Sequence, residues 1–134
     1  MGGPARLKLL LDTHIWIWFL QNPEQIAART LQRLADPSNE LWLSPISTWE
    51  ALMLQRKGRI RLPADLSEWL SKSTAGIFEA PLTHEIALAS QRLMFHVDPA
   101  DRFLAATAQV LDLVLVTADE KLLGLPGIKT LANR

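Results

Sequence analysis

Four acidic side chains stand apart from the other acids of this chain, and the sequence places them far from one another: Asp12, Glu50, Asp101 and Asp119. Carboxylates that meet within about 4–6 Å repel strongly and raise one another's pKa unless a cation lies between them. An oxygen-only ligand set suits Mg²⁺ or Mn²⁺, and such an ion can activate water and neutralise charge at a phosphoryl centre. The hypothesis to test is therefore a fold that gathers these four acids into one metal site.

Two of the acids follow apolar runs that predict buried strands. Asp12 comes directly after Leu7–Leu11, and Asp119 closes the stretch that begins at Leu113. Both are expected at the carboxyl ends of parallel strands, where open α/β sheets bind their ligands. The alternative is that each Asp simply caps the helix that follows it.

The other two acids lie on helix faces that are otherwise apolar. Residues three and four positions apart share a helix face, and the face of Glu50 is apolar except for Ser47. Asp101 shares its face with small apolar residues. Such a carboxylate needs a partner, because burying its charge alone is costly. A buried salt bridge is the alternative for Glu50, and the neighbouring Asp98 is interpreted as a helix N-cap or as a supporting residue of the site.

The elements that must position these acids alternate between short apolar runs and amphipathic stretches, which predicts βαβ units and a mostly parallel sheet. The expected strands are Leu7–Leu11, Leu41–Leu43, Ile77–Leu82, Leu113–Val116 and, at an edge, Ile128–Leu131. Helices are expected just past Asp12 and over residues 22–36, 44–58, 63–70, 83–92 and 98–111.

Composition limits what the protein can be. Its 134 residues suffice for a single domain spanning 1–134, with residues 1–6 left aside as a flexible N-terminal extension. The apolar runs are too short to cross a membrane, and we expect no secretion signal. The absence of cysteine fits a cytoplasmic protein. Because the net charge is zero, RNA could be bound only through a local basic patch.

Four sequence blocks resemble those of the PIN-domain endoribonucleases, and more narrowly the VapC-type toxins of bacterial toxin–antitoxin pairs. The resemblance runs from Leu9 to about Leu131. It is carried by Leu10–His14, Ser44–Glu50, Asp98–Ala108 and Leu115–Asp119. Each block alone is weakly specific, but four blocks in the right order and at the right spacing are strong support for the family.

The resemblance implies a PIN-like three-layer α/β/α fold with a central, mostly parallel sheet. It implies an endoribonuclease that hydrolyses RNA phosphodiester bonds with Mg²⁺, for which Mn²⁺ can substitute. The partners it implies are an RNA substrate, a small cognate antitoxin and a second copy in a homodimer. As the toxin of such a pair, the protein would block translation and growth.

The acidic quartet of the family falls on the four residues identified above, Asp12, Glu50, Asp101 and Asp119. Asp12, Asp101 and Asp119 are the expected metal ligands, and Glu50 is expected to join them directly or through water. The family's supporting hydroxyls fall on Thr13 and Thr117.

Several other residues have two possible roles each. Arg56, Lys57, Arg59 and Arg61 form a basic cluster that either receives RNA phosphates or is a solvated helix end. His14 is expected to be a half-buried structural residue, with a contact to substrate or metal as the alternative. One of Trp16 and Trp18, together with Trp49 or Trp69, is expected to line an antitoxin groove or a dimer contact.

Two rival functions remain. A haloacid-dehalogenase-like phosphoesterase also has an Asp after its first strand, but it needs a second Asp where this chain has His14, and Lys121 is poorly placed as its lysine. A non-catalytic interaction module whose acids only cap helices leaves Glu50 and Asp101 unexplained.

Overall fold

The computed structural model describes residues 6–93 and 98–134 of the chain. At the centre of the described structure lies a sheet of parallel strands in the order β3-β2-β1-β4-β5. The strands are β1 (Lys8–Leu11), β2 (Glu40–Leu43), β3 (Phe78–Glu79), β4 (Val114–Thr117) and β5 (Thr130–Ala132). The expected strands are all present, shifted by one to three residues at most of their ends, and the last lies at an edge as expected.

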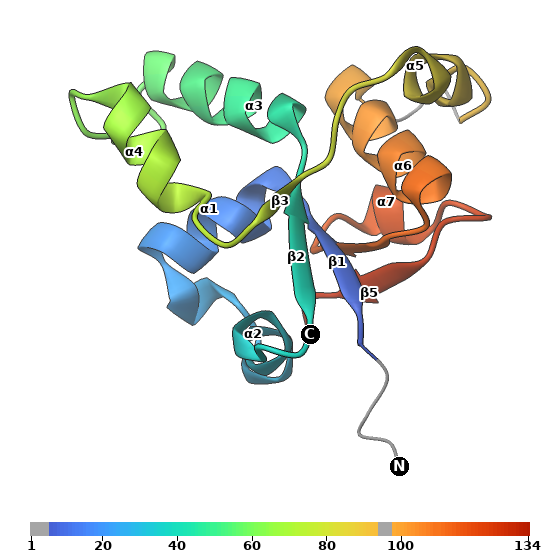
Figure 1. The fold of residues 1–134 in the computed structure, drawn as a ribbon, viewed down its shortest axis with the longest axis horizontal. Coiled ribbons are helices and arrows are strands. Elements are labelled where there is room, and N and C mark those ends of the chain that lie inside the picture. The colour runs from blue at the N-terminus through green and yellow to red at the C-terminus, as the bar shows by residue number, and fades with distance from the viewer. Residues whose placement is uncertain (1–5, 94–97) are drawn as a thin grey trace.

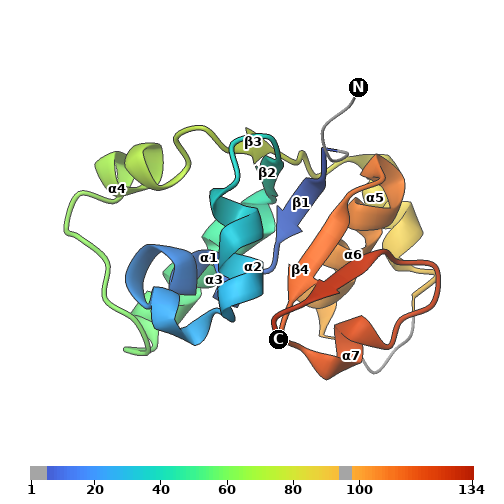
Figure 2. The same ribbon diagram turned by 90° about the horizontal axis from the view of Figure 1, so that it is seen from below.

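Helices cover both faces of the sheet, so the predicted three-layer α/β/α fold is confirmed. Figures 1 and 2 show the first four helices on one side of the sheet and the last three on the other. The first group is α1 (Thr13–Gln21), α2 (Ala28–Ala35), α3 (Pro45–Arg56) and α4 (Leu66–Ser73). The second group is α5 (His84–Ser90), α6 (Pro99–Leu111) and α7 (Glu120–Leu123).

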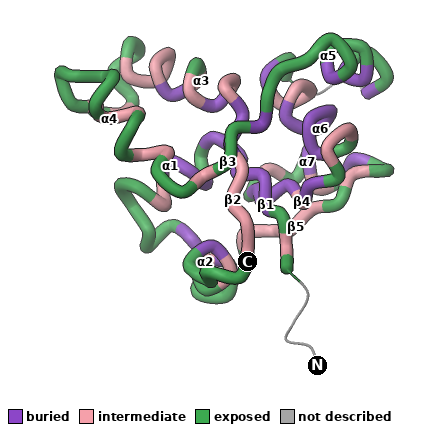
Figure 3. Tube along the Cα trace, in the orientation of Figure 1, coloured by how far each residue is buried: buried purple, intermediate pink, exposed green. Residues whose placement is uncertain are grey.

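Strand β1 joins the two halves of the core. Leu9, Leu10 and Leu11 are each 0% exposed, and Leu10 packs in a different core cluster from its two neighbours. Figure 3 colours most of β1 as buried. Leu10 packs among residues of α5, α6 and α7, whereas Leu9 and Leu11 pack among residues of α1, α2 and α3. A strand buried on both faces reads as a continuous apolar run, which is why β1 was identifiable in the sequence.

Two helices begin later than the sequence suggested. The helix expected from residue 22 is instead a 3₁₀ turn, η1 (Pro23–Gln25), followed by α2. Between them Ile26 is buried in an extended conformation, and the N–H of Ala27 donates to Oδ1 of Asn133 at 2.7 Å. The helix expected from residue 63 begins after Asp65, whose carboxylate caps it.

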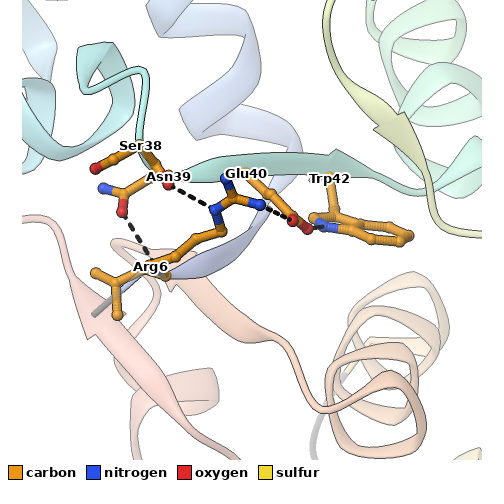
Figure 4. A network of polar contacts seen from close by, with 6 residues as sticks. Arg6, Ser38, Asn39, Glu40 and Trp42 are labelled. Carbon is orange, nitrogen blue, oxygen red and sulfur yellow. Dashed lines mark hydrogen bonds and ion pairs between the residues drawn. The ribbon is translucent and has the colours of Figure 1, made fainter. Parts of the chain in front are cut away.

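The amino end of the sheet is fastened by a polar network (Figure 4). The guanidinium of Arg6 lies 3.1 Å from Oε2 of Glu40 and also donates to the carbonyl of Ser38. The other carboxylate oxygen of Glu40 accepts from the indole N–H of Trp42 at 3.1 Å. The expected N-terminal extension, residues 1–6, lies outside the described residues except for Arg6.

Among the described residues, no helix has both the length and the apolar character needed to cross a lipid bilayer.

Candidate functional site

Asp12 lies at the junction of β1 and α1, buried beneath the carboxyl end of the sheet. Its backbone N–H donates to the carbonyl of Val116, which extends the β1–β4 pairing. Its Oδ1 accepts from the N–H of Thr13 at 2.7 Å, and its Oδ2 accepts from the hydroxyl of Thr117 at 2.6 Å. Burial raises the pKa of Asp12, and these two hydrogen bonds oppose that rise. Asp12 is therefore both a helix cap and a strand-end acid.

Thr117 connects Asp12 to the second strand-end acid. While its hydroxyl donates to Asp12, its oxygen accepts from the backbone N–H of Asp119 at 3.0 Å. The carboxylate of Asp119 in turn caps α7 by accepting from the N–H of Lys121 at 2.9 Å. The end of β4 thus brings Asp119 next to Asp12, and the residue between them in the network is the predicted supporting hydroxyl.

Glu50 faces the same region from α3. Its Oε1 accepts from the hydroxyl of Thr13 at 2.5 Å. Burial raises the pKa of Glu50, this hydrogen bond lowers it, and the charge of Asp12 adds to the rise. No ion pair of Glu50 is found among the described residues. The alternative of a buried salt bridge therefore has no support in the described structure.

Asp101 lies in the first turn of α6, and the pKa of its carboxyl is strongly raised. Burial raises the pKa of its carboxyl to about 7, and the charges of four other acids add to the effect: Asp12, Glu50, Asp119 and Asp98. Charges act on one another in this way only when they lie in one region of low dielectric. In the described parts of the chain, the carboxylate of Asp101 has neither a hydrogen-bond donor nor a cation beside it.

Asp98 and His14 complete the surroundings of the acids. Asp98 caps α6 by accepting from the N–H of Ala100 at 3.2 Å, as the capping interpretation predicted, and its charge also reaches Glu50 and Asp101. His14 is exposed rather than half-buried, because it lies on the outer side of the first turn of α1. Its charge lowers the pKa of both Asp12 and Glu50.

The donor chemistry of the site fits a divalent cation of the magnesium type. Within residues 6–93 and 98–134, no three His, Asp or Glu side chains form a ready-made ligand group. Mg²⁺ does not require one, because it keeps several of its waters and is usually held by only one or two carboxylates. A cation would also relieve the mutual repulsion that raises the pKa of Asp101.

The basic cluster lies at the end of α3 and in the turn beyond it. Arg56, Lys57, Arg59 and Arg61 are all exposed, and none forms an ion pair with a described residue. Gly58 supplies the positive φ of 72° that ends the helix. Exposure of this kind suits either a phosphate contact or a solvated helix end, so both readings of the cluster remain.

The tryptophans divide into core and surface. Trp16 is 0% exposed, and its indole N–H donates to the carbonyl of Ser73 at 3.2 Å while its ring packs on Trp69. It therefore holds α4 against α1, so of the two tryptophans in that expectation only the partly exposed Trp18 could line a groove. Trp49 is 53% exposed and, with Phe78, borders a hollow of about 420 Å³ between α3, α4 and β3.

Sequence reasoning missed one polar residue of the site. Ser47 is 0% exposed, and its hydroxyl oxygen lies 2.9 Å from that of Thr13. Its place three residues before Glu50 marked it as the polar member of an apolar face, but nothing in the sequence paired it with Thr13.

Comparison with known proteins agrees with this architecture. The family model described as PIN domain matches residues 9–127. Ribonuclease VapC22 of Mycobacterium tuberculosis is 30% identical over 116 residues, which cover 85% of this chain and 88% of that protein.

Solved structures show the same fold. VapBC2 from Rickettsia felis, bound to a DNA fragment from its promoter, has a TM-score of 0.71 at 15% identity, covering 94% of this chain and 98% of that one. DNA-bound VapBC from Salmonella typhimurium has a TM-score of 0.70 at 20% identity, covering 96% and 99%.

Proposed function

Because the chain belongs to the PIN domain family, we propose that it is a metal-dependent endoribonuclease that hydrolyses RNA phosphodiester bonds. The observation that carries the proposal is the group of acids around Asp101, whose charges act on one another and which form no ion pair with a described residue. The similarity to a VapC ribonuclease supports RNA as the substrate. The match to the PIN domain family does not support the haloacid-dehalogenase-like alternative.

Asp12, Asp101 and Asp119 are the residues that would hold Mg²⁺ or Mn²⁺, directly or through waters, with Glu50 completing the shell. Once bound, such an ion supplies an activated water and neutralises charge on the phosphoryl group. Thr117 and the N–H of Thr13 fix the orientation of the Asp12 carboxylate. Since each carboxylate oxygen has two lone pairs, Asp12 can accept these bonds and still bind a cation.

Cation binding at Asp101 should depend on pH. With a pKa of about 7, its carboxyl is partly protonated at neutral pH in the absence of a cation. A cation favours the carboxylate, so binding should release protons near neutral pH. Activity should accordingly be lost as the pH falls below neutrality, because protons then compete with the metal.

The basic cluster is the proposed contact for RNA phosphates. Each phosphate contact by Lys or Arg contributes about 0.7 to the slope of log affinity against log salt for a single strand. Replacing Arg56 and Arg59 with Gln, in a protein inactivated by Asp101→Asn, should lower this slope by about 1.4, whereas Arg29→Gln on α2 should leave it unchanged. An unaltered slope would leave the cluster as a solvated helix end.

We further propose that the protein is the toxin of a toxin–antitoxin pair that acts in the cytoplasm to block translation and growth. The neighbours in solved structures are toxin–antitoxin complexes, which supports a small cognate antitoxin as partner. The exposed Trp49 and Phe78 beside the hollow of about 420 Å³ are the kind of apolar surface that marks a protein contact. A homodimer is proposed on the family resemblance alone.

Cleavage of single-stranded and structured RNA, measured with Mg²⁺, with Mn²⁺ and in EDTA, tests the proposed activity. Asp101→Asn should lower the rate by at least about 100-fold, since a catalytic metal contributes several kcal/mol to the transition state. Asp65→Asn is the matched control, because Asp65 is an exposed acid whose capping role Asn can fill. Cleavage that persists in EDTA or in Asp101→Asn would rule out this site.

A further inference from the structure

Three side-chain oxygens stand in line between α3 and α1, and the first of them belongs to a residue with no assigned role. The hydroxyl oxygen of Ser47 lies 2.9 Å from that of Thr13, which lies 2.5 Å from Oε1 of Glu50. Ser47 and Thr13 are 0% and 2% exposed, so their hydroxyls are shielded from solvent. The two ends of the line, Ser47 and Glu50, stand one turn apart on α3, and Thr13 comes from the start of α1.

The direction of the bonds follows from what each group can donate. An ionised carboxylate only accepts, so the single hydroxyl hydrogen of Thr13 goes to Glu50. The bond between Thr13 and Ser47 must then use the hydrogen of Ser47. Ser47 therefore fixes the torsion of the Thr13 hydroxyl in the orientation that serves Glu50.

The hydroxyl of Ser47 is used differently from those of two other buried helix residues. Ser90 and Thr107 each donate to a carbonyl of their own helix, three or four residues back, whereas Ser47, like Thr30 of α2, has its bond outside its own helix. Ser47 is not a cap either, since Ser44 caps α3. A buried serine inside a helix costs stability relative to alanine unless its hydroxyl is used, and this one is used across the helix interface.

We propose that Ser47 is a positioning residue of the acidic site: through Thr13 it holds the carboxylate of Glu50 beside Asp12 and Asp101 for divalent-cation binding. The inference rests on the proposed function, because it concerns the same site. Ser47 touches neither RNA nor metal; it acts only by restricting the Thr13 hydroxyl and, through it, the Glu50 side chain. Residues that orient the ligands of a metal site typically change metal affinity or activity by about 10–100-fold when removed.

The first test measures Mn²⁺ binding to the RNA-free protein by electron paramagnetic resonance of the unbound ion. Ser47→Ala should raise the Kd for Mn²⁺ by about 10-fold. Ser90→Ala removes an equally buried serine hydroxyl, one that bonds within α5, and should leave the Kd unchanged. A Ser47→Ala protein with a lower Tm but an Mn²⁺ affinity within about twofold of wild type would show a merely structural hydroxyl and overturn the proposal.

A double-mutant cycle tests the route through Thr13. If Ser47 acts only by orienting that hydroxyl, Ser47→Ala should weaken Mn²⁺ binding in the wild type and have no further effect in Thr13→Val. An equal loss in both backgrounds would contradict the relay. All four proteins are compared by circular dichroism, so that a folding defect is recognised separately from a change in affinity.

The cycle also separates this inference from the proposed function. A wild-type protein that binds no Mn²⁺ would remove the metal site and, with it, the role of Ser47. Mn²⁺ binding that is lost in Asp101→Asn but unchanged in Ser47→Ala would keep the metal site and overturn the role of Ser47 alone.

Discussion

Acidic side chains have different partners at the two ends of the central sheet. At the amino end, Glu40 has a cationic partner, since the guanidinium of Arg6 lies 3.1 Å from its carboxylate (Figure 4). At the carboxyl end, Asp12 and Glu50 receive hydrogen bonds only from neutral hydroxyls and a backbone N–H, and Asp101 receives none from the described residues. Glu40 at the amino end is paired with a cation, whereas Asp12, Glu50 and Asp101 at the carboxyl end form no ion pair with a described residue.

Neutral donors can hold a carboxylate in place without cancelling its charge. They orient Asp12 and Glu50, yet the pKa of both remains raised because burial outweighs them. At Asp101, the acid without a donor, burial raises the pKa and the charges of the neighbouring acids add to the rise. The two ends therefore differ in that one holds a structural ion pair and the other holds oriented acids without an ion-pair partner among the described residues.

Among the predictions that test this comparison, the largest effect is expected from removal of the Thr117 hydroxyl, which Asp12 and Asp119 share. Thr117→Val deletes both the bond to Asp12 and the acceptor for the N–H of Asp119. We expect metal-dependent RNA cleavage to fall by about 10–100-fold, measured as kcat/KM at limiting Mg²⁺. Thr107→Val is the control, because that equally buried hydroxyl bonds only to the carbonyl of Phe103. Equal losses in the two variants would show that Thr117 serves packing alone.

The second prediction concerns the stability of the metal-free protein. The pKa of Asp101 is raised from its ordinary value of 3.8 to about 7, so between these pH values the folded state binds more protons than the unfolded state. The free energy of unfolding must then fall as the pH rises through this window. In EDTA at pH 8, Asp101→Asn should be more stable than wild type by about 1 kcal/mol, a figure discounted for solvent screening of a half-buried group.

Urea unfolding at pH 5 and pH 8 provides the measurement. The wild type should lose more stability between the two pH values than Asp101→Asn, and Mg²⁺ should restore the wild type alone. Parallel pH dependences of the two proteins would mean that the pKa of Asp101 is not raised in the folded state.

The smallest effect is expected at the amino end. Arg6→Gln breaks an ion pair whose arginine side chain is 63% exposed, so we expect a loss of about 0–1 kcal/mol in chemical denaturation. RNA cleavage should not change, because the pair lies at the opposite end of the sheet from the acids. A fall in cleavage comparable to that of Thr117→Val would show that the two ends are not independent.

Much of the acidic site could be predicted because its signals are local. A charge on an apolar helix face identified Glu50 and Asp101, and the ends of apolar strands identified Asp12 and Asp119. The parallel sheet then brings strand ends to one edge whatever lies between them. Their assignment as metal ligands stays a prediction, which the metal-binding and cleavage measurements test.

What the sequence could not predict depends on contacts between distant segments. Ser47 and Thr13 are 34 residues apart, and only the packing of α3 on α1 joins their hydroxyls. The chain leaves the helical conformation at Ile26 because Asn133, 106 residues away, binds the N–H of Ala27. The sequence could not decide between Trp16 and Trp18 as the buried residue, because the burial of Trp16 depends on the docking of α4.

The pairing of β1 with β4 also determines when the acidic site forms during folding. Asp12 and Thr117 are 105 residues apart in sequence, and they meet only after β4 has docked beside β1. Contacts this distant require a long loop to close, which costs conformational entropy and slows folding. During synthesis Asp12 is therefore made long before the residues that complete its surroundings. A ribosome-bound fragment that ends before β4 carries no complete acidic site.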